Sequence, residues 1–327
     1  MPTSDTAATT AGTAAANADT TMLGTASPPA GAEIRPVPRL QLERIVAAAL
    51  LEDAPAGDLT ADLLIPADAQ ATAFVVAREP GVVSGLEAFA TAMRLTDQRL
   101  RVEPSVRDGE RFEAGARLAV VTGPARGLLT AERVGLNLLQ RLSGIATQTR
   151  AMVDAAAGHP ARIADTRKTT PGLRVLERYA VRCGGGSNHR DNLSEAVMAK
   201  DNHLALLGEG EELTAALVGL RARLGHTQHL EVEIDRLDQL EPVVSAGVDT
   251  VMLDNFSLED LAEGVRRVAG RCTVEASGTV TLERIAAIAA TGVDVISSGA
   301  LTHSVRAVDL GLDIDLRGSR ADGTEPA

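Results

Sequence analysis

The two lysines of this chain are the residues whose placement most directly suggests chemistry. Of the 32 Lys and Arg residues, only Lys168 and Lys200 are lysines. Lys168 lies in IADTRKTTPG and Lys200 lies in AVMAKDNHL. A planar guanidinium does not replace a compact ammonium on a flexible stem. The two lysines are either chance survivors in an arginine-rich chain or the sign of a local requirement for an ammonium, and their neighbours favour the requirement.

Further cations cluster between the two lysines. Arg167 precedes Lys168, and the segment CGGGSNHR places His189 and Arg190 after three glycines, which allow tight backbone geometry close to a ligand. Arginines suit the bidentate capture of carboxylates. The chain as a whole has a net charge of −12, so cations that bind an anion must be gathered locally. Residues 165–203 therefore predict an anion-binding pocket.

Polar residues end nearly every apolar, strand-like run in the second half of the chain. They are Asp165, Thr166, Glu233, Asp235, Asp254, Asn255, Glu275, Ser277, Ser297 and Ser298. Each of them alone could be a helix cap or a turn residue, but together they favour a shared site. Carboxylates among cations are expected if they hold Mg²⁺ or ribose hydroxyls, because Mg²⁺ binds one or two carboxylates together with substrate phosphates. The loops ASGT at 276–279 and SSGA at 297–300 suit a phosphate.

The secondary-structure elements that must position these residues can be predicted from the order of apolar runs, loops and helical stretches. From about residue 161 onward, apolar strand-like runs alternate with short loops and helical stretches, which is typical of parallel βα units. About six such units favour a barrel over an open sheet, and the carboxyl ends of barrel strands carry the chemistry. Before them, RLQLERIVAAALLED predicts a helix, and residues 71–127 read as short strands around a helix at GLEAFATAMRL.

The fold class we expect is α/β, with four segments. Residues 1–32 form a disordered tail, since they are rich in Ala, Thr, Pro and Gly, and residues 317–327 form a second tail. Residues 33–129 form a small N-terminal α+β sandwich domain, to which a C-terminal strand or helix can return. Residues 130–316 form the parallel α/β barrel. It starts with a long helix capped by Thr130, whose first turn holds Arg133, where the helix dipole disfavours a cation.

Composition excludes several classes of protein. A strongly acidic chain does not attract nucleic acid or an anionic membrane non-specifically. No apolar run reaches the roughly 18–20 residues that span a bilayer, and the N-terminus lacks the basic start and apolar stretch of a signal peptide. Cys183 and Cys272 lack the CxxC spacing, so a reducing, cytoplasmic setting is expected.

Seven segments, in order, carry a resemblance to a known family. The segments are ERVGLNLLQRLSGIAT, DTRKTTPGLR, GGGSNHR, AKDNH, EVEID, MLDN and SSGALTHS. As a set they resemble the quinolinate phosphoribosyltransferases, also called carboxylating nicotinate-nucleotide pyrophosphorylases, from about Leu40 to Asp315. The resemblance implies an N-terminal sandwich domain, an incomplete barrel of six or seven strands, and a homodimer. It also implies the reaction of quinolinate with phosphoribosyl pyrophosphate to give nicotinate mononucleotide, pyrophosphate and CO₂, a step of de novo NAD synthesis.

The resemblance also implies a role for each matching residue. The quinolinate ligands would be Arg133, supplied by the neighbouring subunit, together with Arg167, His189, Arg190 and Lys200. Lys168 would face the pyrophosphate, while Glu233 and Asp254 would serve Mg²⁺ and the ribose, and these three would be the catalytic residues. The 5′-phosphate would be held by Ser277, Gly278, Gly299 and His303, and Ser298 would be a further substrate-binding residue. One departure is EASGTV, where the family usually has Ser and Gly at the positions of Ala276 and Thr279.

Two other interpretations remain open on the sequence. A Schiff-base aldolase could use a barrel lysine as its nucleophile, although the dense cations around each lysine argue against it. A related phosphoribosyltransferase, or a non-catalytic relative, could bind another anionic acceptor.

Overall fold

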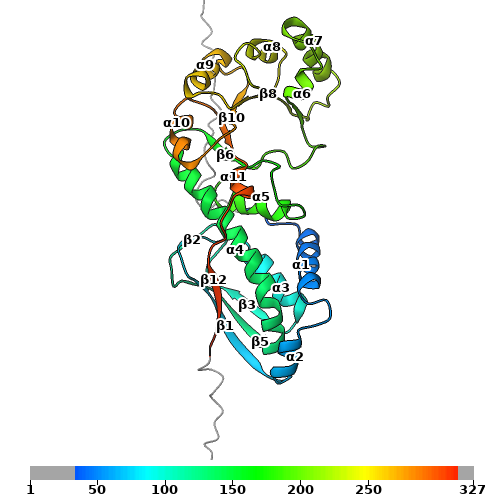
Figure 1. Ribbon diagram of the computed structural model, residues 1–327, viewed down its shortest axis with the longest axis vertical. Helices are drawn as coiled ribbons and strands as arrows, with labels where there is room; N and C mark the ends of the chain where they lie inside the picture. The colour runs from blue at the N-terminus through cyan, green and yellow to red at the C-terminus, as the bar shows by residue number, and fades with distance from the viewer. Residues whose placement is uncertain (1–33, 316–327) are drawn as a thin grey trace, which may run out of the picture.

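A computed structural model of the protein describes residues 34–315. The predicted tails at 1–32 and 317–327 lie outside the described residues. Two parts are stacked along the long axis of the molecule, with the N-terminal domain at one end and the parallel-sheet domain at the other (Figure 1). One helix, α4, runs through both parts. This arrangement confirms the expected α/β class with a small N-terminal domain.

The N-terminal domain is built on a four-stranded antiparallel sheet in the order β12-β1-β5-β3. Along β1, every second residue from Ala73 is fully buried, because successive side chains of a strand point to opposite faces. The helices α3 and α4 cover the sheet. The remaining bounds are α1 Arg39–Asp53, α2 Leu59–Leu64, β1 Gln70–Ala77, β2 Gly81–Val82, α3 Leu86–Thr96, β3 Arg101–Pro104, β4 Arg111–Phe112 and β5 Arg117–Pro124.

Helix α4, Ala125–Ala155, has 31 residues and begins five residues earlier than we expected. Its N-cap residue is Pro124, and Thr130 lies inside the helix, where its hydroxyl donates to the carbonyl of Arg126 at 2.9 Å. The expected Thr130 cap is therefore wrong. Arg133 lies in the third turn rather than the first, so the helix dipole places no special cost on this cation. The hydroxyl satisfies its hydrogen bond locally, which lets a threonine sit within the helix.

The second domain is a six-stranded, wholly parallel sheet in the order β6-β11-β10-β9-β8-β7. The strands β7 to β11 pair in chain order, and β6 pairs with β11, so this incomplete barrel is open between β6 and β7. The strands are β6 Arg162–Ala164, β7 Val197–Ala199, β8 Leu230–Ile234, β9 Thr250–Asp254, β10 Thr273–Ser277 and β11 Val295–Ser297. The helices are α5 Arg174–Cys183, α6 Asp201–Leu204, α7 Gly210–Arg221, α8 Leu240–Ser245, α9 Leu258–Val268, η1 Leu282–Arg284, α10 Ile285–Ala289 and α11 Ala300–His303.

The last described strand, β12 (Leu310–Ile314), leaves the barrel and pairs antiparallel with β1, where Ile314 lies opposite Ala73. The N-terminal sheet therefore includes a strand from the far end of the chain (Figure 1). Helix α4 joins the two apolar cores, since Leu128 and Leu139 pack in the N-terminal core while Ile145 and Met152 pack in the barrel core. Among residues 34–315, no helix combines the length and apolar composition needed to cross a membrane.

Candidate active site

A cavity of about 350 Å³ opens at the carboxyl ends of the barrel strands. We call it the strand-end cavity. Because all six strands are parallel, their carboxyl ends meet at one edge of the barrel, as the sequence predicted. The cavity is lined by Thr166, Arg167, Lys168, His189, Arg190, Met198, Lys200, Glu233, Met252, Asp254, Ser277 and Ser297. Eight of these residues were predicted site residues: Arg167, Lys168, His189, Arg190, Lys200, Glu233, Asp254 and Ser277.

Lys200 and Glu233 form an ion pair across two adjacent strands. Lys200 directly follows β7, and the last residue of β7, Ala199, lies beside Val232 of β8. This register brings the next residue of each strand together, so the ammonium and the carboxylate face one another. Of the cavity's two predicted metal-binding carboxylates, Asp254 has the freer charge, since its side-chain partner is the neutral amide of Asn255 at 2.8 Å.

Three cations of the cavity lack a carboxylate partner. Within the described part of the chain, Arg167, Lys168 and Arg190 form no ion pair, and the buried Nε of Arg167 has no hydrogen-bond partner. Arg190 donates from its guanidinium to the carbonyl of Ala196 at 3.0 Å. Burial lowers the pKa of Arg190, and the positive charge of Arg167 lowers it further. Neighbouring cations without counter-ions are unfavourable unless an anion joins them, so this arrangement favours an anionic ligand.

His189 lines the cavity, but both of its ring nitrogens contact the protein. The backbone N–H of Arg190 donates to Nδ1 at 2.7 Å, and Nε2 lies 3.1 Å from a carboxylate oxygen of Glu231. Burial lowers the pKa of His189, but the hydrogen bond to Glu231 and the negative charges around it outweigh burial and raise the pKa. The Arg190 N–H that points at Nδ1 opposes a second ring proton. We therefore assign the neutral ring with its hydrogen on Nε2.

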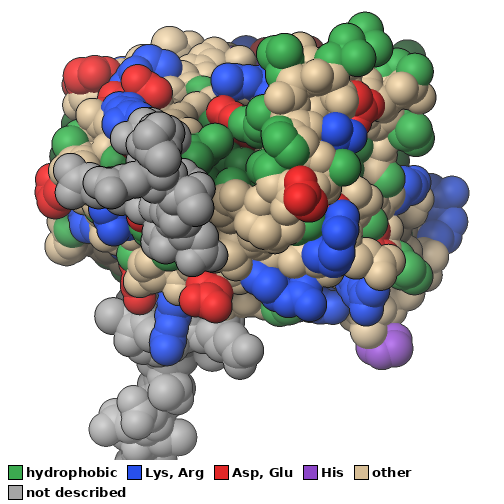
Figure 2. Space-filling model, turned by 90° about the horizontal axis from the view of Figure 1, so that it is seen from below, with side chains coloured by type: hydrophobic (Ala, Val, Ile, Leu, Met, Phe, Trp, Pro, Cys, Tyr) green, Lys and Arg blue, Asp and Glu red, His purple; other side chains and the backbone are tan. Residues whose placement is uncertain are grey.

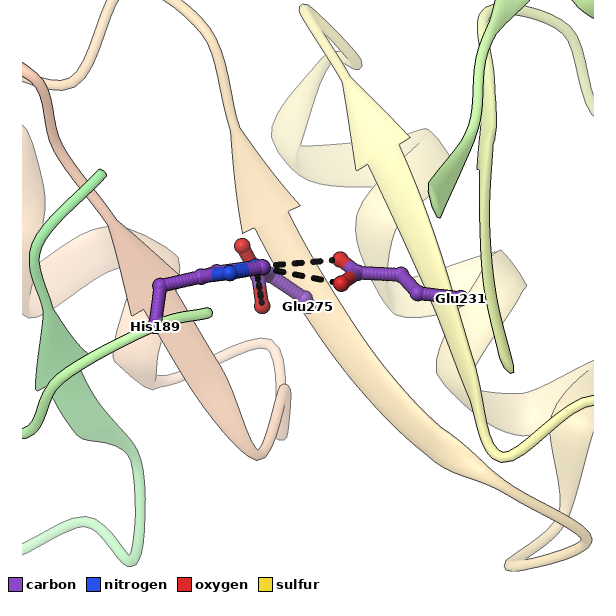
Figure 3. Close-up of side chains that lie close together, drawn as sticks. All are labelled: His189, Glu231 and Glu275. Carbon is purple, nitrogen blue, oxygen red and sulfur yellow. Dashed lines mark hydrogen bonds and ion pairs between the residues drawn. The ribbon is translucent and has the colours of Figure 1, made fainter. Parts of the chain in front are cut away.

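Glu231 and Glu275 are buried beneath the cavity. From the sequence we named Glu275 only as a strand-end carboxylate without a role, and we did not name Glu231. Figure 3 shows the His189 ring pointing toward Glu231, with the Glu275 carboxylate beside it. Burial raises the pKa of Glu275 to about 7, and the negative charge of Glu231 adds to this effect. The signal was present in EVEID, because residues two apart in a barrel strand face the same side. Since Glu233 faces the interior, Glu231 does so too.

A half-buried ion pair holds the loop that carries Lys168. Arg141 of α4 donates to the fully buried carboxylate of Glu177 at 2.6 Å, to the hydroxyl of Thr170 at 2.8 Å, and to the carbonyl of Thr302 at 2.8 Å. Thr302 in turn donates from its hydroxyl to the carbonyl of Lys168 at 2.7 Å. Arg141 thus joins the loop at residues 166–170 to the helix α11.

Asp165 holds the backbone that carries His189. It directly follows β6, is fully buried, and accepts from the N–H of His189 at 2.7 Å and from the amide of Asn188 at 2.6 Å. Burial raises the pKa of Asp165, whereas the positive charge of Arg178 and these hydrogen bonds lower it. Asp165 therefore fixes the backbone of the segment between β6 and β7, which crosses the open side of the barrel.

Both halves of the chain match descriptions of one protein family. "Quinolinate phosphoribosyl transferase, C-terminal domain" matches residues 145–313, and "Quinolinate phosphoribosyl transferase, N-terminal domain" matches residues 58–143. The chain belongs to the quinolinate phosphoribosyltransferase family. The resemblance carried by the seven sequence segments is therefore confirmed.

Individual relatives of this family agree over nearly their whole length. The chain is 40% identical to the probable carboxylating nicotinate-nucleotide pyrophosphorylase of Bacillus subtilis, over 85% of this chain and 94% of the relative. It is 44% identical to the corresponding enzyme of Mycobacterium leprae, over 81% and 94%. The solved structure of nicotinate-nucleotide pyrophosphorylase from Francisella tularensis is 38% identical, covers 86% of this chain and 99% of that chain, and superposes with a TM-score of 0.79.

The loops that the family resemblance assigns to a phosphate are shaped by close contacts. A side chain at Gly278, whose φ is +82°, would lie 2.3 Å from the amide oxygen of Asn255. Thr279 follows with a φ of 45°, an uncommon conformation for a β-branched residue, and its hydroxyl donates to Asn255 at 3.0 Å. At the second loop, a side chain on Gly299 would meet both Lys168 and His303 within 3.1 Å. Gly299, Lys168 and His303 therefore lie together.

Five residues of the family-implied set do not line the cavity, namely Arg133, Gly278, Ser298, Gly299 and His303. Ser298 is buried, its N–H donates to the carbonyl of Ala164 at 3.0 Å, and its hydroxyl lies 3.5 Å from the carbonyl of Val280. The preceding residue, Ser297, lines the cavity instead, because neighbouring strand residues face opposite sides. Arg133 is exposed on α4 and does not line the strand-end cavity of its own chain.

The three glycines before His189 have a role that we did not expect. A side chain on Gly184 would lie 2.5 Å from Thr149 of α4, and one on Gly186 would lie 2.8 Å from the same residue. These glycines therefore allow a close approach to helix α4, and their approach to a ligand stays a prediction. The missing side chains let the segment that carries His189 and Arg190 pack directly on this helix.

Proposed function

We propose that this chain transfers the phosphoribosyl group of phosphoribosyl pyrophosphate to quinolinate, with loss of CO₂, to give nicotinate mononucleotide and pyrophosphate. The observation that carries the proposal is a set of three cations that have no carboxylate partner among residues 34–315. They are Arg167, Lys168 and Arg190, and they lie in a cavity at the strand ends of a chain of this family. Quinolinate is a dianion at neutral pH, and phosphoribosyl pyrophosphate is also anionic. The cavity therefore has the charge that both substrates require.

The proposed role of each residue follows from its position in the cavity. Arg167 and Arg190 would bind the carboxylates of quinolinate with paired hydrogen bonds and so hold its ring nitrogen toward the ribose. Lys168 lies beside Gly299 and His303, where it would stabilise the departing pyrophosphate. Glu233 and Asp254 would stabilise the positive charge that develops on the ribose as the pyrophosphate leaves. The roles of these residues stay predictions until they are tested.

The decarboxylation then follows from the product of the transfer. The ring nitrogen forms its bond to C1 of the ribose and becomes positively charged. The bond between C2 of the ring and its carboxylate breaks, and CO₂ leaves. The electron pair that stays on C2 is stabilised by the adjacent positive nitrogen, and the carbon takes up one proton. The cations would serve mainly to orient the dianion for this sequence.

The residues present also fit a magnesium ion. Glu233 and Asp254 lie near the carboxyl ends of the neighbouring strands β8 and β9 and line the same cavity. One or two carboxylates together with phosphate oxygens are the ligands that Mg²⁺ prefers. A magnesium ion would neutralise charge on the pyrophosphate. We expect Glu233→Gln and Asp254→Asn each to raise the Mg²⁺ concentration needed for half-maximal turnover more than they raise KM for quinolinate. An unchanged Mg²⁺ response in both variants would remove them from a metal site.

We also propose a homodimer in which Arg133 enters the strand-end cavity of the second subunit. The side chain of Arg133 is exposed and makes no hydrogen bond or ion pair among residues 34–315, so it is available to a second chain. The helices α1 and α2 carry five strongly exposed leucines, a composition that suits burial against a second copy. They are Leu40, Leu51, Leu59, Leu63 and Leu64. Seen from the end of the N-terminal domain, hydrophobic side chains group beside cationic ones (Figure 2).

The decisive experiment measures both products from the two substrates. Purified protein, Mg²⁺, phosphoribosyl pyrophosphate and quinolinate labelled in its 2-carboxylate should release labelled CO₂ and pyrophosphate in equal amounts. Nicotinate is the control acceptor, because it lacks the carboxylate that leaves. Pyrophosphate release with nicotinate and none with quinolinate would show an enzyme with a different acceptor. Trapping of a carbonyl substrate by borohydride would support the aldolase alternative. The cytoplasmic location stays a prediction.

A further inference from the structure

A second cavity, of about 390 Å³, lies inside the barrel below the strand-end cavity. We call it the inner cavity. It is lined by residues near the amino ends of the strands, such as Thr250 and Thr273, and by Glu231 and Glu275. His189 and Arg190 line both cavities. The peptide that joins these two residues therefore separates the proposed substrate site from the interior of the barrel.

The His189 ring is held from within the inner cavity. Its Nε2 lies 3.1 Å and 3.4 Å from the two oxygens of Glu231 and 3.6 Å from an oxygen of Glu275 (Figure 3). The exposed fractions of the three side chains are only 12%, 4% and 5%, for His189, Glu231 and Glu275 respectively. On the other edge of the ring, Nδ1 accepts the N–H of Arg190. The ring thus connects two buried carboxylates to the backbone of a proposed substrate-binding arginine.

A histidine with two carboxylates is also a possible metal-binding set, because the three ligand atoms lie close together. The contact at Nδ1 argues against this use. Since Nδ1 accepts a hydrogen bond, the single hydrogen of the neutral ring lies on Nε2, which then has no lone pair for a metal. The ring therefore donates to the carboxylates instead of joining them as a ligand.

The cluster is also poorly suited to a purely structural role. Two adjacent buried carboxylates share one N–H donor, and Oε1 of Glu275 has no hydrogen-bond partner among the residues that the structure describes. Burying charge in this way costs free energy, and well-packed apolar residues in place of a buried ionic group are often neutral or stabilising. The cost of burying these two glutamates favours a role beyond packing.

We propose that Glu231 and Glu275 are positioning residues, which hold the His189 ring in the barrel interior and thereby fix the backbone from which Arg190 reaches quinolinate. The N–H of His189 is held by Asp165 at 2.7 Å, and the N–H of Arg190 is held by the ring. The backbone at His189 and Arg190 is thus fixed before a ligand binds, and this lowers the free-energy cost of orienting the ligand. This inference rests on the proposed binding of quinolinate by Arg190.

The test compares shape-matched variants of the full-length protein. In Glu231→Leu, the ring loses its acceptor, and KM for quinolinate should rise about tenfold through loss of orientation. KM for phosphoribosyl pyrophosphate and the melting temperature should stay near those of the wild type. Glu231→Gln keeps an acceptor oxygen, so its KM for quinolinate should stay within about threefold of the wild-type value. Glu275→Leu should resemble Glu231→Leu and serves as the second variant if Glu231→Leu does not fold.

The control is Thr250→Val, which alters a residue of the same inner cavity whose hydroxyl contacts His229 instead of His189. It should leave both KM values unchanged. An unchanged KM for quinolinate in both leucine variants would overturn the proposal. So would equal rises of both KM values together with a lower melting temperature, which would indicate a structural role. If the wild type releases no CO₂ from quinolinate, the proposed function fails instead.

The ring hydrogen can be observed directly, without an assay. The chain has six histidines, and ¹⁵N NMR of histidine-labelled protein, with His189→Gln for assignment, should show His189 with its hydrogen on Nε2 at neutral pH. A hydrogen on Nδ1 would overturn the proposal. So would one equivalent of Zn²⁺ or Mn²⁺ that binds the wild type and is lost in Glu275→Gln, since that result would assign the cluster to a metal.

Discussion

The hydroxyl of Thr302 donates a hydrogen bond of 2.7 Å to the carbonyl of Lys168, and this bond ties the helix α11 to the loop that carries the unpaired lysine. Thr302 is fully buried, so the loss of its hydroxyl leaves the carbonyl without this donor in the interior. For Thr302→Val we expect the free energy of unfolding to fall by about 1–2 kcal/mol, measured in urea. KM for phosphoribosyl pyrophosphate should rise more than KM for quinolinate. Thr302→Ser keeps the hydroxyl and should behave like the wild type, so a matching loss in the serine variant would contradict this reason.

The ion pair of Arg141 with the fully buried Glu177 is expected to show strong coupling in a double-mutant cycle. Arg141→Leu leaves the fully buried carboxylate of Glu177 without its counter-ion, which should cost about 3 kcal/mol of unfolding free energy. Arg141→Leu combined with Glu177→Leu should be more stable than Arg141→Leu alone, because no charge remains unpaired. Activity should not return in the double variant, since the loop at 166–170 has still lost its support. Additive destabilisation in urea unfolding would show that the two residues act independently.

Arg190→Lys is expected to impair quinolinate binding almost as much as Arg190→Ala. A lysine keeps the charge but cannot reproduce two parallel hydrogen bonds to a carboxylate. It would also lose the hydrogen bond from the guanidinium to the carbonyl of Ala196. The measurement is KM for quinolinate at saturating phosphoribosyl pyrophosphate. A near-normal KM in Arg190→Lys would show that charge alone suffices at this position.

The stability of the protein should depend on the protonation of Glu275. Its pKa in the folded protein is raised from 4.5 to about 7, chiefly by burial and then by the charge of Glu231, while His189 and Lys200 act in the opposite direction. A raised carboxyl pKa favours folding below pH 4.5, and this contribution is lost as the pH rises through 7. Between pH 5 and pH 8 the wild type should lose about 2 kcal/mol relative to Glu275→Gln. If the unfolding free energies of the wild type and of Glu275→Gln changed in parallel with pH, the raised pKa of Glu275 would be refuted.

Subunit mixing tests whether Arg133 acts in the neighbouring subunit. Arg133→Ala and Lys168→Ala should each be nearly inactive, because each removes a proposed substrate contact. In a C₂ heterodimer of the two variants, one site would have both residues intact and the other would lack both. Activity should return to as much as half of the wild-type value per heterodimer. If subunit exchange is verified and activity does not return, Arg133 acts within its own chain or has no role in the site.

The sequence by itself determined the α/β class, the parallel barrel and most of the strand-end cavity. The reason is periodicity, since parallel strands put their carboxyl ends at one edge, and the polar residues that end them must meet there. The two lysines in an arginine-rich chain marked the same place. The family followed from short segments in a fixed order, which report the site directly because its residues are grouped on the loops that follow the strands.

The tertiary structure decided which side chains face the cavity and which only support it. Ser297 rather than Ser298 lines the cavity. Which of the two serines faces the cavity depends on the residue at which β11 ends, and the sequence does not determine that residue. Arg141 lies on α4 and reaches Thr302 of α11, a contact over 161 positions in the chain that no local pattern contains.

The contacts among His189, Glu231 and Glu275 were also decided by the tertiary structure. His189 meets Glu231 and Glu275 only because the sheet curves and brings β8 and β10 around the segment that crosses the open side of the barrel. Local spacing predicts which way a residue points, but only the curvature of the sheet decides which residues it meets.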